Sequence, residues 1–147
     1  MPTPASPAFE MRHIVCFEET NLVGNVYYAN HVRWQGRCRE LFLHAHAPQL
    51  LDEVARGLVL VTTRVACEYF DELYAFDEIV VRMRAGAIGQ GRVTMLFEYW
   101  RVREGAESLV AQGEQQIACL RCAEDGRHVP TGLPEALVRA LEPYRQH

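Results

Sequence analysis

Residues 17–43 read FEETNLVGNVYYANHVRWQGRCRELFL, and this stretch decides the fold. It has the pattern of a strand end, a turn that contains Gly24, and a long helix. On a helical wheel at about 100° per residue, apolar side chains cover a wide arc, which is formed by Val32, Trp34, Gly36, Cys38, Leu41, Phe42, Leu43 and Ala45. An arc of this width predicts a helix that other structure wraps around.

Arg39 lies inside that apolar arc, together with Gln35 and His46. A guanidinium group buried alone is very costly, so Arg39 must be paired or must face a ligand. A functional role is the favoured interpretation, and a structural ion pair is the alternative. Arg37 lies on the polar side of the helix, where simple solvation also explains it.

Composition limits the class of protein. The chain has 147 residues, 49% of them hydrophobic, and a formal net charge of −4. These values predict one globular domain over residues 1–147, with residues 1–9 as a flexible tail, and they argue against a nucleic-acid-binding protein. No apolar run approaches the roughly 18 residues of a membrane span, and the first residues lack a signal-peptide pattern, so a cytoplasmic location is expected.

Five cysteines are an odd number, which argues against a disulfide framework. Cys119 and Cys122 form a lone CxxC without a second pair or suitably spaced histidines. Neither a metal site nor a cofactor is therefore expected.

The rest of the chain has mostly β character. Strands are predicted near residues 13–18 and within 57–70, 77–89, 92–104 and 108–123, where apolar and polar residues alternate. The Gly89-Gln90-Gly91 turn favours a hairpin, residues 46–57 have the composition of a connecting stretch, and residues 131–144 predict a short helix with Pro134 in its first turn. One long helix followed by an antiparallel meander indicates an α+β domain in which the sheet wraps around the helix.

This element order, together with ETN-L-VGNVYYANHVRWQGR, resembles the hot-dog fold of acyl thioesterases such as the 4-hydroxybenzoyl-CoA thioesterases. Within that group the chain most closely resembles the thioesterases of enediyne polyketide biosynthesis. The resemblance implies a five- or six-stranded antiparallel sheet around one central helix. It also implies a homotetramer built from dimers whose sheets join, with active sites at the subunit interface.

The resemblance also implies a catalytic set of Asn21, Tyr28 and Arg39. Asn21 stands where many hot-dog thioesterases have a catalytic aspartate, and Tyr28 where some have histidine. An amide cannot act as a base at neutral pH, and a phenol is a weak one, although both can hydrogen-bond. The hypothesis is therefore oxyanion stabilisation by Arg39 and Asn21, helped by the backbone N–H groups that open the helix at residues 30–32.

Substrate contacts are predicted for five further side chains: Thr62, Tyr27, Trp34, Arg37 and Glu68. Thr62 is preferred to Thr63 for the acyl channel, and the two aromatic residues have packing as their alternative role. Glu68 could act as a base, although an ion pair with Arg64 or Arg82 is the more common role for such a residue. Glu19 is a second candidate base.

The predicted reaction is hydrolysis of a β-ketoacyl, polyene-type thioester from the acyl carrier domain of an iterative polyketide synthase. The β-keto acid released can lose carbon dioxide to give a methyl ketone. Exposed arginines would dock the acidic carrier, and the candidates are Arg33, Arg37, Arg82, Arg84, Arg101 and Arg103. Alternatives are a general acyl-CoA thioesterase that uses Glu19 or Glu68 as base, a non-catalytic acyl-binding module, and, ranked low, a hot-dog dehydratase or hydratase.

Overall fold

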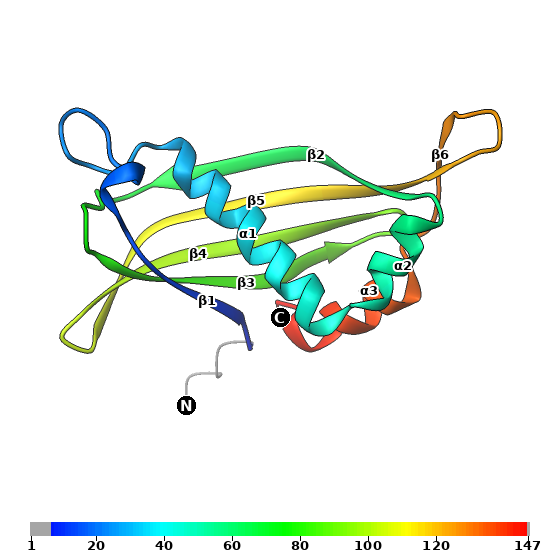
Figure 1. Ribbon diagram of the computed structural model, residues 1–147. Coiled ribbons are helices and arrows are strands. Elements are labelled where there is room, and N and C mark those ends of the chain that lie inside the picture. Colours follow the sequence, from blue (N-terminus) through cyan, green and yellow to red (C-terminus); the bar gives the residue numbers. More distant parts are fainter. Residues whose placement is uncertain (1–6, 147) are drawn as a thin grey trace.

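Helix α1 (Ala29–His46) lies across one face of an antiparallel sheet in the computed structural model, which describes residues 7–146 (Figure 1). The sheet has six strands in the order β1-β3-β4-β5-β2, and β6 pairs with β5. The strands are β1 (Phe9–Ile14), β2 (Leu58–Tyr69), β3 (Glu78–Ile88), β4 (Arg92–Arg103), β5 (Ala106–Cys122) and β6 (His128–Pro130). The shorter helical elements are η1 (Phe17–Glu19), α2 (Gln49–Ala55), α3 (Glu135–Leu141) and η2 (Glu142–Tyr144). The predicted α+β architecture is confirmed.

Alternation along the strands explains why the sheet has one buried face. In β4, the side chains of Val93, Met95, Phe97 and Tyr99 are buried, whereas those of Thr94, Leu96, Glu98 and Trp100 are partly exposed on the other side. The buried set packs against Trp34, Cys38 and Phe42 of α1 in one continuous core. Period-two burial of this kind is typical of an antiparallel sheet that has one face covered.

Strand β2 forms one edge of the sheet and carries an irregularity. Its register with β5 shifts between Thr62 and Arg64, so Thr63 is an extra residue in the ladder. Before the shift Thr62 pairs with Ile117, and after it Val65 pairs with Gln115. The shift exchanges the faces of all later side chains in β2, because strand side chains alternate with period two.

The hairpin between β4 and β5 uses a two-residue turn. Glu104 has φ 51° and Gly105 has φ 80°. Positive φ at both central residues is the geometry that matches the twist of the flanking strands in a tight hairpin. The Gly-Gln-Gly hairpin predicted between residues 89 and 91 is also present, with Gly89 N–H donating to the carbonyl of Arg92 at 2.8 Å.

Two predictions of local structure are wrong, and a third is contradicted at one residue, Phe9. The first strand begins at Phe9 and ends at Ile14, since its backbone pairs with β3 over that range. Phe9 and the residues before it had been predicted as a tail; residues 1–6 lie outside the described part of the chain. Residues 46–57 include the helix α2, whose Leu50 is buried in the core, so tertiary packing overrides weak local signals here.

Among the described residues, no helix is both long enough and apolar enough to cross a bilayer.

Candidate functional site

Arg39 extends from the middle of α1 toward the edge of the sheet formed by β2 and β5. Its Nη1 donates to Oγ1 of Thr62 at 3.2 Å and to Oε1 of Gln115 at 3.0 Å. Within residues 7–146, no carboxylate forms an ion pair with this guanidinium, which is half-buried. The positive charge of Arg39 is thus held by neutral oxygen atoms and is not cancelled by a carboxylate.

The surroundings of Arg39 are otherwise neutral. Cys38, next to it on α1, is fully buried, and burial raises the pKa of its thiol to about 12. Burial also raises the pKa of the thiols of Cys67 in β2 and Cys119 in β5. All three thiols therefore stay protonated at neutral pH, and none is suited to act as a nucleophile.

Asn21 lies in the turn between η1 and α1. Its Oδ1 accepts the N–H of Val23 at 3.0 Å, and its backbone pairs with Asn25 and Gly24 within the same turn. The side chain is exposed, at the end of the molecule where the loop projects in Figure 1. Within residues 7–146 the amide nitrogen of Asn21 has no hydrogen-bond partner, so it is available as a donor.

Tyr28 immediately precedes α1. Its side chain is 63% exposed, its ring lies 4.7 Å from that of Tyr27, and its carbonyl accepts the hydroxyl of Tyr69 at 2.8 Å. Arg39 follows Tyr28 by 11 residues, which corresponds to roughly 16 Å along a helix. Within one chain, therefore, Tyr28 does not meet Arg39.

The backbone N–H groups at the start of α1 are already used. Asn30 donates to the carbonyl of Tyr27 at 2.9 Å, and His31 donates to the carbonyl of Tyr28 at 3.3 Å. The N–H groups of residues 30–32 were predicted to add their dipole at an oxyanion. The turn that opens α1 already satisfies the N–H groups of Asn30 and His31.

Glu19 is saturated by donors. Its carboxylate accepts the N–H of Cys16 at 2.9 Å and Nε1–H of Trp34 at 2.8 Å, and it contacts Nε2 of His13 at 2.8 Å. Burial alone would raise the pKa of Glu19, but the hydrogen bonds from Cys16, His13 and Trp34 outweigh it and lower the pKa. A carboxylate stabilised in its charged form is a poor general base, so this geometry argues against catalysis by Glu19.

Two of the predicted substrate contacts lie away from Arg39. Trp34 is 1% exposed, packs in the core and has its ring N–H bound to Glu19. Glu68 follows the irregularity in β2, so it shares the outer face of the sheet with its partner Gln112, whereas Thr62 faces α1. The expected pairing of Glu68 with Arg64 or Arg82 is wrong, since these arginines pair with other carboxylates.

The arginines predicted to dock a carrier fall into two groups. Four lie on the strands and each pairs with acidic side chains: Arg82 with Glu10 and Glu107, Arg84 with Glu98, Arg101 with Asp71, and Arg103 with Asp77.

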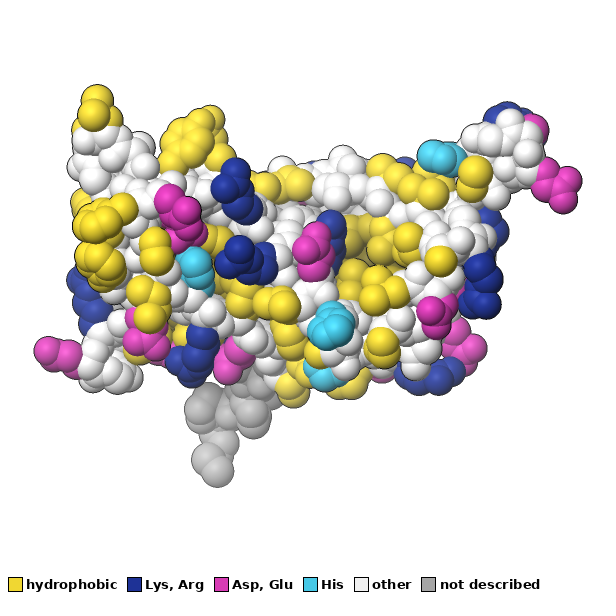
Figure 2. Space-filling model, in the orientation of Figure 1, with side chains coloured by type: hydrophobic (Ala, Val, Ile, Leu, Met, Phe, Trp, Pro, Cys, Tyr) yellow, Lys and Arg dark blue, Asp and Glu magenta, His cyan; other side chains and the backbone are white. Residues whose placement is uncertain are grey.

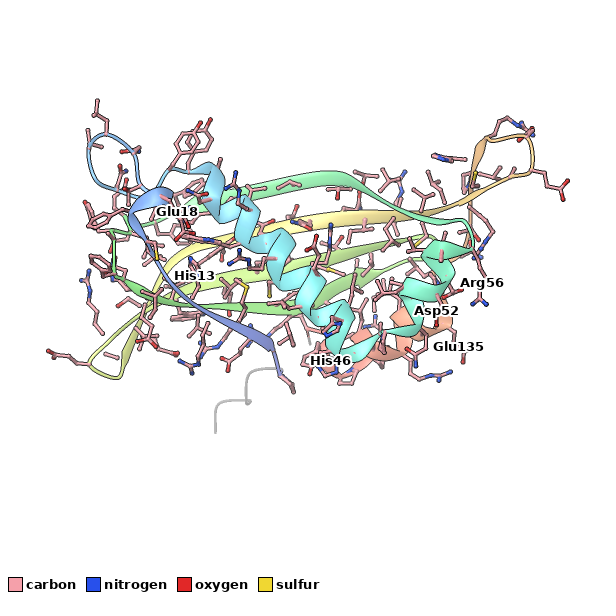
Figure 3. All side chains as sticks on the ribbon, viewed as in Figure 1. His13, Glu18, His46, Asp52, Arg56 and Glu135 are labelled. Atoms are coloured by element: carbon pink, nitrogen blue, oxygen red, sulfur yellow. The ribbon has the colours of Figure 1, made fainter. Side chains whose placement is uncertain are left out.

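Arg33 and Arg37 lie on the exposed side of α1, and neither forms an ion pair with any residue that the structure describes. They line a hollow of about 170 Å³ together with Trp34, His13, Glu18 and Glu19. Figure 3 shows His13 and Glu18 beside the N-terminal half of α1.

Sequence reasoning assigned no functional role to three polar residues of this region. Gln115 of β5 is 3% exposed, and a signal for it existed, because it shares a face with the buried Ala111, Ile117 and Cys119. Gln35 is fully buried, and its Nε2 donates to the carbonyl of Ala66 at 3.1 Å. His31 is 3% exposed. In the described part of the chain, Oε1 of Gln35 and both ring nitrogens of His31 have no hydrogen-bond partner.

His31, Gln35 and Arg39 are spaced four residues apart, so they form one polar stripe along the side of α1 that faces β2 and β5. Aromatic rings of Trp34, Tyr69 and Tyr99 surround His31 at centroid distances of 5.1, 4.7 and 5.4 Å. Within residues 7–146 no cluster of three or more His, Cys, Asp or Glu side chains is arranged to hold a metal ion.

Comparison with known proteins assigns this arrangement to a family. Residues 15–141 match the thioesterase-like superfamily. The chain belongs to this superfamily. A crystal structure of the dynemicin thioesterase, from a study of induced fit and allosteric effects upon polyene binding, is 45% identical, with a TM-score of 0.90 over 96% of this chain and 99% of that one. The comparison with curated protein sequences gave no match.

More distant structures share the fold. A 1,4-dihydroxy-2-naphthoyl-CoA thioesterase from Synechocystis is 17% identical, with a TM-score of 0.79 over 92% of this chain and 96% of that one. A mutant 4-hydroxybenzoyl-CoA thioesterase in complex with 4-hydroxybenzoyl-CoA is 15% identical, with a TM-score of 0.80 over 91% of this chain and 98% of that one. The predicted hot-dog fold and the predicted activity of a thioester hydrolase are thereby confirmed.

Proposed function

We propose that this thioesterase hydrolyses a β-ketoacyl thioester carried on phosphopantetheine, and that Arg39 stabilises the oxyanion. The observation that carries the proposal is the guanidinium of Arg39, which is half-buried and, among the residues that the structure describes, is held by the neutral oxygens of Thr62 and Gln115 alone. A cation left without a counter-ion in a partly desolvated site can attract a developing negative charge. The 45% identity to a thioesterase studied with a bound polyene supports a polyene acyl chain.

The reaction needs no carboxylate base. Water adds to the thioester carbonyl, whose oxygen becomes an oxyanion beside Arg39. The C–S bond then breaks, and the departing sulfur takes up the proton that the added water has lost, which gives the thiol and a β-keto acid. Each preorganised donor in such a site can be worth about 3 to 4 kcal/mol. The β-keto group makes the carbonyl more electrophilic, and the acid formed can lose carbon dioxide to leave a methyl ketone.

Geometry disfavours the two carboxylates considered as bases. Glu19 is tied to three donors, and Glu68 lies on the outer face of the sheet. The general acyl-CoA thioesterase with a carboxylate base therefore ranks second.

A second copy of the chain would complete the site. Tyr28 lies beside the end of β2, at Tyr69, and Asn21 lies in the loop that precedes Tyr28, while Arg39 lies near Thr62 in the first half of β2. Strand β2 is an edge strand of 12 residues. If two copies join antiparallel along this edge, the loop of one copy reaches the region of Arg39 in the other. This arrangement supports a homodimer, and the proposed assembly is a dimer of such dimers.

Exposed apolar side chains fit that assembly. Leu22 is 102% exposed, Val23 81%, and Tyr27 46%. Figure 2 shows hydrophobic side chains gathered at the end of the molecule where this loop projects. Such a concentration is typical of a surface that a partner covers.

The proposed partner in catalysis is an acidic acyl carrier domain, docked on Arg33 and Arg37. The four strand arginines already pair with carboxylates, whereas Arg33 and Arg37 form no ion pair within residues 7–146. Charge complementarity of this kind steers association and weakens as salt rises. Charge reversal of both should raise KM for a carrier-bound thioester and leave a pantetheine thioester unaffected, whereas Arg92→Glu, which alters another exposed arginine, should change neither.

The central experiment measures thiol release from two pantetheine thioesters of equal chain length, one β-ketoacyl and one saturated. We expect the wild type to prefer the β-ketoacyl substrate, and Arg39→Ala and Asn21→Ala each to lose most of the rate. Equal rates for the two thioesters, unchanged in Arg39→Ala, would favour the alternative in which a carboxylate acts as base. Absence of thiol release above background would identify a non-catalytic acyl-binding module.

A further inference from the structure

We infer that Gln115 is a positioning residue, which holds Arg39 in place without cancelling its charge. The inference rests on the function proposed above for Arg39. Gln115 projects from β5 onto the face of the sheet that α1 covers, is 3% exposed, and accepts Nη1–H of Arg39 at 3.0 Å. Its amide oxygen fixes the position of the guanidinium and leaves the net charge of the pair at +1.

The side chains around Gln115 are uncharged, so the absence of a charge on Gln115 itself matters for Arg39. Its register partners on the adjacent strands are Val65 in β2 and Met95 in β4. The residues that precede and follow it on the same face of β5 are Gly113 and Ile117. None of these side chains carries a charge, so residue 115 is the position from which β5 could neutralise Arg39.

A purely structural solution would use a carboxylate at this position. On the outer face of the same sheet, Arg84 pairs with Glu98 at 2.7 Å, and Arg82 pairs with Glu10 at 2.6 Å and Glu107 at 2.7 Å. Charge-assisted hydrogen bonds are stronger than neutral ones, so glutamate at position 115 would hold Arg39 more firmly. The amide of Gln115 holds Arg39 more weakly, but it leaves the positive charge of Arg39 available to a bound anion.

The test compares two variants of Gln115: one changes whether residue 115 can hydrogen-bond Arg39, and the other changes whether residue 115 carries a charge that neutralises Arg39. Gln115→Glu keeps an acceptor for Arg39 and adds a counter-ion, whereas Gln115→Met keeps the approximate size and removes the acceptor. We expect kcat for the β-ketoacyl pantetheine thioester to fall about 10-fold in Gln115→Met and about 100-fold or more in Gln115→Glu, with smaller changes in KM. Thermal unfolding should show Gln115→Glu to be at least as stable as Gln115→Met.

The decisive result is this opposite order of stability and activity. If Gln115 served structure alone, the more stable variant would also be the more active one, and a Gln115→Glu enzyme as active as Gln115→Met would overturn the inference. Gln116→Glu is the matched control, because it adds the same charge one residue further along and on the other face, where Gln116 bonds to Thr63. It should stay within about twofold of the wild type.

If Gln115→Glu does not fold, a second pair of variants, at Thr62, tests the same inference. Thr62 is exposed on the edge strand and also holds Arg39. Thr62→Asp should lower kcat more than Thr62→Val, and Thr63→Asp, on the opposite face, should not. Equal losses in Thr62→Asp and Thr62→Val would overturn the inference.

A binding measurement distinguishes failure of the inference from failure of the proposed function. Decanesulfonate carries a permanent negative charge and an apolar chain, so its affinity reports the free charge of Arg39 without any turnover. We expect it to bind the wild type and Gln115→Met, and to bind Gln115→Glu at least about 10-fold more weakly. If hydrolysis fails but this order holds, only the proposed function is lost; if the wild type binds no decanesulfonate, or all three proteins bind equally, the inference is overturned.

Discussion

The two faces of the sheet treat charged and polar side chains differently. On the outer face, Arg82 and Arg84 each pair with carboxylates at 2.6 to 2.7 Å. On the face that α1 covers, and within residues 7–146, Arg39 hydrogen-bonds only to neutral oxygens, and the buried His31 and Gln35 have polar atoms without partners. Unsatisfied polar groups in a protein interior are expensive. The ion pairs of the outer face therefore serve stability, whereas the unsatisfied polar groups of the covered face lower stability, which is consistent with a functional role.

The largest expected effect separates activity from stability at Arg39. Replacing Arg39 with Met should lower kcat/KM for the β-ketoacyl thioester by about 10² to 10³. The unfolding temperature should stay unchanged or rise, since a partly buried cation without a counter-ion is removed. Kinetics and thermal denaturation of the same preparation check this; a large loss of stability together with activity would assign Arg39 to the fold.

Acid should destabilise the protein through His31. Burial lowers the pKa of His31 to about 4, whereas an unfolded histidine has a pKa of about 6.5. Between these values the unfolded chain binds a proton that the folded chain does not, so stability falls as the pH drops, by about 3 kcal/mol in total.

Urea denaturation of wild type and His31→Phe at about pH 7 and about pH 4.5 measures this linkage. The variant should lose less stability than the wild type over that interval. His44→Gln, at an exposed position of α1, is the control and should behave as the wild type does. An equal acid dependence in His31→Phe would contradict the assignment.

Gly113 tests how closely the covered face is packed. A Cβ atom at this position would lie 2.1 Å from Nε2 of Gln35 and 2.7 Å from the carbonyl oxygen of Ala66. Gly113→Ala should therefore destabilise the protein by about 1 to 3 kcal/mol. Gly36→Ala, in the middle of α1 with no atom within 4 Å of the added Cβ, should instead stabilise it by about 0.5 to 1 kcal/mol. Equilibrium denaturation gives both values, and a Gly113→Ala protein as stable as the wild type would show that the space around Gly113 is larger than its contacts indicate.

The smallest effect is expected on the outer face. Arg82→Met removes two ion pairs and the contact of its guanidinium with the ring of Trp100, whose centroid lies 5.6 Å away. Partly exposed pairs of this kind contribute little, so the loss should be about 1 kcal/mol or less. Thiol release from the pantetheine thioester should be unchanged. A fall in kcat for Arg82→Met would contradict the assignment of the outer face to stability and of the covered face to activity.

Much of the fold was predictable because its signals are local. The alternation in β4, the turn between β3 and β4, and the apolar arc of α1 each depend on residues close in sequence. The helix α2 was missed, since burial of Leu50 in a distant core stabilises its short helix. The same limit applies to His31, whose burial comes from rings contributed by other elements.

By itself the sequence determined that an arginine lies on the apolar side of a long helix, because helical periodicity fixes which side of the helix each residue occupies. Only the tertiary structure decided what Arg39 meets. The irregularity at Thr62 reverses the faces of β2, so that Thr62 turns toward Arg39 and Glu68 turns away from it. Gln115 reaches Arg39 across 76 residues of chain. Alternation along β5 indicates which face Gln115 occupies, but which residue of a distant strand or helix lies opposite it follows from the packing of the whole domain.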